Sequence, residues 1–167
     1  NNSFSPSKGS FIESSIQYFT PVFGSEYEYT QIMADASIYF QTWKNQVFAM
    51  NFFGETIIGN APFNQLALLG GTKRMRGYYE GRYRDKNLLL VQTEYRIPLF
   101  WRIGMVLFGG VGEVNNQISN YTFNDVRYNY GTGLRFMLDK KKKINIRLDA
   151  GFGNRISGYY LTIGEAF

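Results

Sequence analysis

Apolar and polar residues alternate with a period of two along most of this 167-residue chain. The alternation is clearest in four consecutive segments, residues 88–98, 102–112, 127–138 and 144–153. In each segment one set of alternate positions is mainly aliphatic or aromatic, and the other set includes charged residues, amides or glycines. Because successive side chains of a strand point to opposite faces, this pattern predicts four β-strands with one apolar and one polar face.

The same alternation, less regular, predicts strands at residues 9–19, 30–40 and 45–57, and a last strand at 158–167. The sequence therefore predicts an all-β, antiparallel protein with eight strands. Short connections alternate with longer ones along the chain, and the longest is a loop of about residues 60–86. Short turns at one end and long loops at the other are typical of a transmembrane β-barrel of the bacterial outer membrane.

Alternation also occurs in soluble antiparallel sheets, so the choice depends on other features. The apolar faces are uninterrupted over about 10 residues, the length that crosses a bilayer when a strand is tilted. The polar faces are charged and rich in glycine, whereas a soluble lipocalin-like barrel has an apolar interior. Aromatic residues near the predicted strand ends resemble interfacial girdles. These residues are Tyr27, Tyr29, Trp43, Trp101 and Tyr159. Together these features favour the membrane barrel.

The composition excludes most enzyme chemistry. The chain has no cysteine and no histidine, which excludes disulfides, thiolate catalysis, Ser-His relays and His-ligated metals. Three carboxylates, Glu13, Asp35 and Glu55, have no partner at a catalytic spacing, so we interpret them as lumen or rim residues. We expect no cofactor and no enzymatic activity. The net charge is +5, but the basic residues are scattered except at 139–143, which does not favour a nucleic-acid partner.

Seven glycines fall on the predicted polar faces of three adjacent strands. They are Gly104, Gly110, Gly112, Gly131, Gly133, Gly151 and Gly153. Glycine in a strand marks either local bending of the wall or the close approach of another backbone. The basic loop 70–82 directly precedes these strands and is the candidate for the approaching segment.

Several motifs resemble the Omp85 superfamily, which includes barrel-assembly proteins, translocation-and-assembly proteins, two-partner secretion transporters and surface antigen D15 domains. The resemblance rests on "GG" at 70–71, "MRGYY" at 75–79, "DKN" at 85–87, "TEYRIPL" at 93–99, "YGTGLRF" at 130–136, "IRLDAGFG" at 146–153 and "GYYLTIGEAF" at 158–167. It is specific from about residue 70 onward and general before that. The sequence of residues 76–87 is most similar to the corresponding sequence of assembly-type members from Bacteroidota.

The resemblance implies a sixteen-stranded barrel whose long loop folds into the lumen. In the family, the Arg-Gly-Phe/Tyr tip of that loop docks on the inner wall. In this chain Arg76, Gly77 and Tyr78 occupy that motif. The family's acidic partner on the next strand corresponds to Glu94, which alternation independently places on the polar face. A buried guanidinium needs such a partner because desolvating an unpaired charge is costly.

The chain departs from the family pattern at one position. The family often has Phe-x-Asp on the following strand, and here the match is Phe108 followed by Gly109 and Gly110, so the aspartate is absent. We therefore expect Arg76 to depend on Glu94, with Asp149 nearby.

The last predicted strand is similar to the signal by which assembly machinery recognises barrel substrates. Its signal residues are Tyr159, Leu161, Ile163, Gly164 and Phe167. In the family this strand pairs weakly with the first one and forms a lateral gate, and an edge strand can template an incoming strand through main-chain hydrogen bonds.

Eight strands can close a small barrel, but side chains fill its interior, so a loop of some twenty residues does not fit inside. We therefore expect residues 1–167 to be the C-terminal half of a sixteen-stranded barrel. The chain begins at Asn1 without a leader and is either a mature product or a piece of a longer protein. The alternative is a true eight-stranded barrel whose basic loop stays outside.

The functional expectation is an outer-membrane barrel that inserts or translocates proteins. Its expected partners are outer-membrane lipid and lipopolysaccharide, client outer-membrane or secreted proteins, and accessory lipoproteins. The alternative function is a passive pore or structural barrel with a basic, anion-selective lumen.

Overall fold

The computed structural model describes residues 5–118, 121, 125–139 and 141–167. Its main element is an eight-stranded sheet with the order β1-β2-β3-β6-β7-β8-β9-β10. The bounds are β1 Gly9–Phe19, β2 Tyr29–Gln41, β3 Val47–Gly59, β6 Asn87–Phe100, β7 Ile103–Asn115, β8 Arg127–Asp139, β9 Ile144–Gly153 and β10 Ile156–Ile163. Every neighbouring pair is antiparallel, which confirms the predicted all-β antiparallel sheet of eight strands.

Three short 3-10 turns lie wholly within the described ranges, at Pro21–Phe23, Trp43–Asn45 and Phe63–Gln65. No helix in this part of the chain is long and apolar enough to cross a membrane. The connection between β7 and β8 and the turn between β8 and β9 lie partly outside the described residues.

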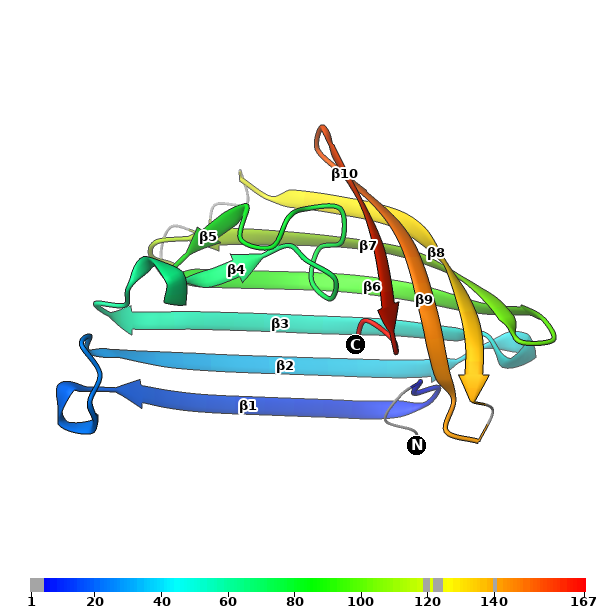
Figure 1. Cartoon of the computed structure of the whole chain (residues 1–167), viewed down its shortest axis with the longest axis horizontal. Coiled ribbons are helices and arrows are strands. Elements are labelled where there is room, and N and C mark those ends of the chain that lie inside the picture. Colours follow the sequence, from blue (N-terminus) through cyan, green and yellow to red (C-terminus); the bar gives the residue numbers. More distant parts are fainter. Residues whose placement is uncertain (1–4, 119–120, 122–124, 140) are drawn as a thin grey trace.

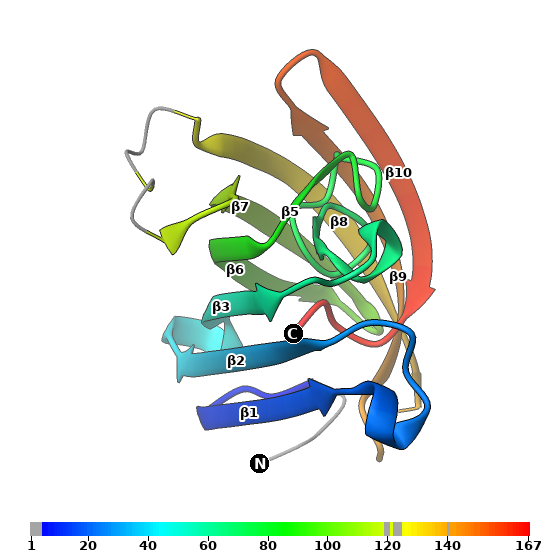
Figure 2. The same cartoon turned by 90° about the vertical axis from the view of Figure 1, so that its left-hand side faces the viewer.

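The sheet curves into an open trough. Figure 1 shows β1, β2, β3, β6 and β7 running side by side, with β8 curving toward β9 and β10, which cross at a steep angle, and Figure 2 shows the curvature from the side. In the described part of the chain β1 pairs only with β2 and β10 only with β9, so the sheet does not close on itself. The structure is consistent with part of a β-barrel wall.

The two faces of the sheet differ as the alternation predicts. The convex face carries large exposed apolar side chains, including Ile12, Ile16, Phe52, Leu89, Leu107, Val111, Leu134, Leu148, Leu161 and Ile163. Trp43, Trp101 and Tyr159 are also exposed, but Tyr29 is not. The ring of Tyr29 is buried and stacks on Phe19 at a centroid distance of 4.4 Å, so its assignment to an interfacial girdle is wrong.

The long loop lies on the concave side of the sheet and has its own secondary structure. Two short strands, β4 Ala67–Leu69 and β5 Tyr83–Asp85, form a separate antiparallel pair. Figure 2 shows this pair inside the curve. The apolar side chains of the loop form a buried cluster with residues of β2, β3 and β6. The cluster consists of Tyr29, Phe53, Ile57, Ala67, Leu69, Met75, Tyr78, Leu88 and Leu90.

The last strand is shorter than predicted. It ends at Ile163, and residues 164–167 turn away from the sheet onto the concave side. Gly164 makes this turn with a φ of 90°, in the left-handed region that favours glycine. Of the five predicted signal residues, Tyr159, Leu161 and Ile163 lie in β10, while Gly164 and Phe167 lie beyond it.

Candidate functional site

The tip of the long loop is a compact set of turns between Gly70 and Gly81. The Gly71 N–H donates to the Tyr78 carbonyl at 3.0 Å, and the Gly81 N–H donates to the Leu69 carbonyl at 3.2 Å. These bonds bring the two arms of the loop together, so residues 73–78 form a narrow tip. Their side chains and main-chain groups reach the concave face of the sheet.

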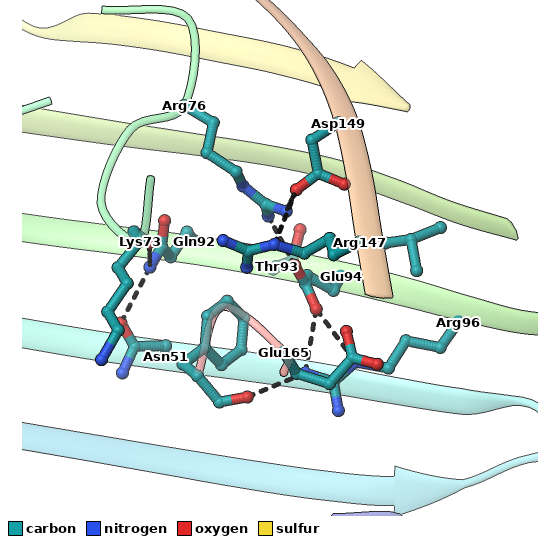
Figure 3. Close-up of polar contacts among 12 residues, drawn as sticks. Asn51, Lys73, Arg76, Gln92, Thr93, Glu94, Arg96, Arg147, Asp149 and Glu165 are labelled. Atoms are coloured by element: carbon teal, nitrogen blue, oxygen red, sulfur yellow. Dashed lines mark hydrogen bonds and ion pairs between the residues drawn. The ribbon is translucent and has the colours of Figure 1, made fainter. Parts of the chain in front are cut away.

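Arg76 occupies the centre of this contact and is 1% exposed. Its Nη2 lies 2.5 Å from Glu94 Oε1 on β6, and its Nη1 lies 2.7 Å from Asp149 Oδ2 on β9. Figure 3 shows the guanidinium between the two carboxylates. Arg76 therefore ties the loop to two strands that are separated in the sheet by β7 and β8.

Phe108 contributes the third side of the Arg76 pocket. The Arg76 Cζ lies 3.6 Å from the centroid of the Phe108 ring, a distance at which a cation over an aromatic face is attracted. Gly131 on the neighbouring strand leaves the room that this ring needs, because a Cβ there would lie 2.7 Å from Phe108 Cε2. Asp149, on β9, supplies the second carboxylate in place of the aspartate that is missing at Gly110.

The ionic contacts extend beyond Arg76 into a buried cluster. Its members are Arg76, Glu94, Arg96, Arg135, Arg147, Asp149 and Glu165. Arg135 Nη1 lies 2.5 Å from Asp149 Oδ1, and Arg96 Nη2 lies 2.9 Å from Glu94 Oε2. Arg147 Nη2 donates to the Thr72 carbonyl of the loop at 2.8 Å. We call these seven residues the arginine cluster.

Main-chain groups of the tip are held by polar side chains that the motifs did not identify. Asn129 Nδ2 donates to the Arg76 carbonyl at 2.8 Å, and Gln92 Nε2 donates to the Lys73 carbonyl at 3.0 Å. The Gly77 N–H donates to the Tyr160 hydroxyl at 2.9 Å. All three side chains lie on the polar face of their strands. The alternation therefore shows which residues face the loop, but it does not show which of them contact it.

Tyr78 anchors the tip on its other side. Its side chain is fully buried in the apolar cluster, and its hydroxyl donates to the Tyr128 carbonyl at 2.9 Å. The same hydroxyl accepts the Asn154 N–H at 2.9 Å. The tip thus has an ionic anchor at Arg76 and an apolar anchor at Tyr78, on adjacent parts of the wall.

Arg74 extends the basic tip toward the acidic inner face of β2 and β3. Its Cζ lies 3.5 Å from the centroid of the Phe53 ring. Burial lowers the pKa of the Arg74 guanidinium, and the carboxylates of Glu55 and Asp35 act in the opposite direction. An arginine side chain nevertheless stays charged at neutral pH.

Two glycines allow the tip to touch the wall through its backbone. Gly77 has a φ of 113°, and a Cβ there would lie 2.9 Å from the Gly151 carbonyl carbon. A Cβ at Gly151 would lie 2.6 Å from the carbonyl carbon and oxygen of Arg76. Both contacts involve backbone, which cannot rotate away as a flexible side chain can.

We therefore expect Gly151→Ala to displace the loop tip and to destabilise the protein by about 1–3 kcal/mol. Chymotrypsin cleavage after Tyr78 measures the displacement, and urea unfolding measures the stability. The matched control is Gly109→Ala, where a Cβ would meet its nearest atom at 3.4 Å, an ordinary contact. Equal cleavage of the two variants at the parent rate would contradict close backbone contact at Gly151.

A curved antiparallel sheet with an apolar convex face and a loop docked on a charged concave face is consistent with a segment of a β-barrel wall. The whole chain, residues 1–167, matches the model of the Omp85 superfamily domain. The chain therefore belongs to the Omp85 superfamily, whose members are outer-membrane proteins and are generally non-enzymatic transport or assembly proteins. No curated protein sequence gives a significant match to this chain.

Proposed function

We propose that this chain forms the C-terminal eight strands of a sixteen-stranded barrel in the bacterial outer membrane, of the surface antigen D15 or assembly type. The barrel inserts client proteins into the membrane or translocates them across it. The observation that carries the proposal is the loop tip held on the concave wall by Arg76, Glu94 and Asp149 in a chain of the Omp85 superfamily.

The convex face supports the membrane setting. Its apolar side chains are exposed along all eight strands, and soluble monomers rarely expose continuous apolar patches of that extent. The concave face supports a wide barrel, since an eight-stranded barrel has no room for a folded loop in addition to its own side chains. Eight further strands between β10 and β1 would complete such a barrel, with only weak pairing at the β10 edge.

The docked loop has a defined task in this proposal. It braces β6 against β8, β9 and β10 from inside, so the curved wall keeps its shape while the β10 edge is offered to a client strand. The client pairs with that edge through main-chain hydrogen bonds, which needs no bond chemistry from the barrel. The sequence of residues 76–87 favours an assembly-type member of Bacteroidota origin.

The proposal is tested by reconstituting the full-length protein in lipid vesicles and adding an unfolded outer-membrane barrel as client. Heat-resistant migration of the client on a gel measures its folding into the membrane. We expect the parent to accelerate client folding over empty vesicles and Arg76→Ala to lose most of the acceleration. Lys73→Ala is the matched control, because the contact at Lys73 uses its main-chain oxygen. Client folding at the empty-vesicle rate with the parent protein would contradict the proposal.

The alternative, a passive pore, is distinguished by conductance in planar bilayers. A basic lumen that conducts freely gives large, steady, anion-selective channels. Small and irregular currents are expected instead if the docked loop and residues 164–167 occupy the lumen. Large steady channels together with unaccelerated client folding would favour the pore.

A further inference from the structure

Residues 164–167 form a strap across the concave side of the sheet, which is not part of the loop contact described above. The Gly164 N–H donates to the Asn145 carbonyl on β9 at 2.8 Å. At the other end, Phe167 packs against Tyr39, Val47 and Ala49, a small apolar cluster on β2 and β3. Figure 1 shows the C-terminus lying over these strands. The strap therefore joins the two sides of the trough near the short turns.

Glu165 brings a carboxylate from the strap into the arginine cluster. Its side chain is 4% exposed, and its Oε2 lies 2.8 Å from Arg135 Nε and 4.0 Å from Arg96 Nε. Asn145 Nδ2 donates to its Oε1 at 2.8 Å. Arg96 also donates to the Phe167 carbonyl, at 2.8 Å. The strap is thus held by the same arginines that surround the loop anchor.

The loop and the strap are connected through shared partners. Arg135 contacts both Asp149 and Glu165, and Asp149 also contacts Arg76. Arg96 contacts Glu94, which is the other partner of Arg76. Figure 3 shows Glu165 and Arg96 next to Glu94, with Arg76 beyond it.

The charges of the cluster indicate that docking of the loop and docking of the strap favour each other. The wall itself supplies three guanidinium groups and two carboxylates to the cluster, which leaves one net positive charge. The loop adds the positive charge of Arg76, and the strap adds the negative charge of Glu165. Docking the loop without the strap would leave two net positive charges in a buried site, where like charges repel strongly. Among the described residues, Arg76 Nε and Arg147 Nη1 already have no hydrogen-bond partner, which agrees with a surplus of donors.

We propose that docking of the loop tip and docking of the strap 164–167 are positively coupled through the arginine cluster, with Arg96 and Arg135 as the positioning residues. Release of either segment weakens the hold on the other. Because the strap continues β10, a change that frees the end of β10 also loosens the loop. The coupling belongs to this chain's own segments, and only its use during client insertion rests on the function proposed above.

The test uses the absence of cysteine from the chain. Two single-cysteine probes are introduced separately into the full-length protein in lipid vesicles: Met75→Cys, at the fully buried loop tip, and Ala166→Cys, at a strap position that is 4% exposed. The rate of reaction with a maleimide reports how often each segment opens. We expect Glu165→Gln to raise labelling of the loop probe by about tenfold, in the range of directly coupled contacts.

A second variant releases the strap without changing the charges of the cluster. Phe167→Ala removes the apolar anchor of the strap and leaves the seven charged residues in place, and we expect it also to raise labelling of the loop probe. In the reverse direction, Arg76→Gln is expected to raise labelling of the strap probe by a similar factor, since coupling is reciprocal. Glu13→Gln, the same chemical change at an exposed inner carboxylate on β1 outside the cluster, is expected to leave both probes at the parent rate.

Faster labelling of the loop probe in both strap variants supports the coupling. Faster labelling of the strap probe with an unchanged loop probe would show that the two segments dock independently and would overturn it. Unchanged labelling of both probes in Glu165→Gln would overturn it as well. None of these readouts depends on client folding, so a failure of the coupling is distinguishable from a failure of the proposed function.

Discussion

Replacing Arg76 by alanine is expected to lower the free energy of unfolding by about 3–5 kcal/mol, because two buried carboxylates each lose one of their arginine partners. Glu94 and Asp149 both have side chains that are 0% exposed. The cavity left by the guanidinium also removes the contact with the Phe108 ring. Urea unfolding of the refolded protein in lipid vesicles measures the loss, and chymotrypsin cleavage after Tyr78 reports the undocked tip.

Arg76→Lys is the informative companion to this variant. Lysine keeps the charge but presents a single ammonium group, which cannot hold two carboxylates in the forked geometry of a guanidinium. We expect an intermediate loss of stability and partial exposure of the tip. We also expect the alanine variant still to enter membranes, because the convex face and the strand pairing are unchanged. If the alanine variant unfolds in urea like the parent and its loop tip resists chymotrypsin equally well, Arg76 does not anchor the loop.

The second large effect is expected for Glu94→Gln. This change removes the carboxylate that contacts Arg76 and Arg96 and leaves four guanidinium groups beside two carboxylates in a buried site. We expect a loss of about 3–5 kcal/mol of stability from uncompensated buried positive charge. A control at Glu55, which is 8% exposed and accepts a hydrogen bond from Gln31 at 2.6 Å, tests the same chemical change outside the cluster. Glu55→Gln is expected to cost roughly 1 kcal/mol.

The double variant Arg76→Ala with Glu94→Gln measures the interaction between the two side chains separately from the other effects of each substitution. Each single change breaks the same contact, so the double variant should lose less than the sum of the two, by about 1–3 kcal/mol. Purely additive losses would mean that the 2.5 Å contact between Arg76 and Glu94 does not stabilise the protein.

The strands and their faces follow from the sequence because a half-buried sheet imposes a period of two on every strand. That period alone is enough to place Glu94 on the concave face. It cannot place Asp149 beside Arg76, because residues 73 positions apart meet only through the curvature of the sheet and the path of the loop. The contacts of Gln92, Asn129 and Tyr160 with the loop tip depend on the same curvature, so the period does not reveal them either.

Two local features also lie beyond the reach of the alternation pattern. The pair β4 and β5 has three residues in each strand, too few to show a period. Leu161 and Ile163 alternate as strand residues do, and this pattern predicts a final strand that continues to Phe167. The structure ends β10 at Ile163, where a left-handed Gly164 and the contacts of Glu165 and Phe167 turn the chain inward.

We propose that the docked loop requires a barrel wider than the eight strands of this chain. The most direct test is the intact mass of the polypeptide carrying these residues, extracted from outer membranes, together with its native mass in detergent. We predict a polypeptide of about twice 19.3 kDa or more, enough for sixteen strands in one barrel. A monomeric polypeptide of 19.3 kDa in the membrane would contradict the wider barrel, because eight strands would then have to close around a loop for which they have no room.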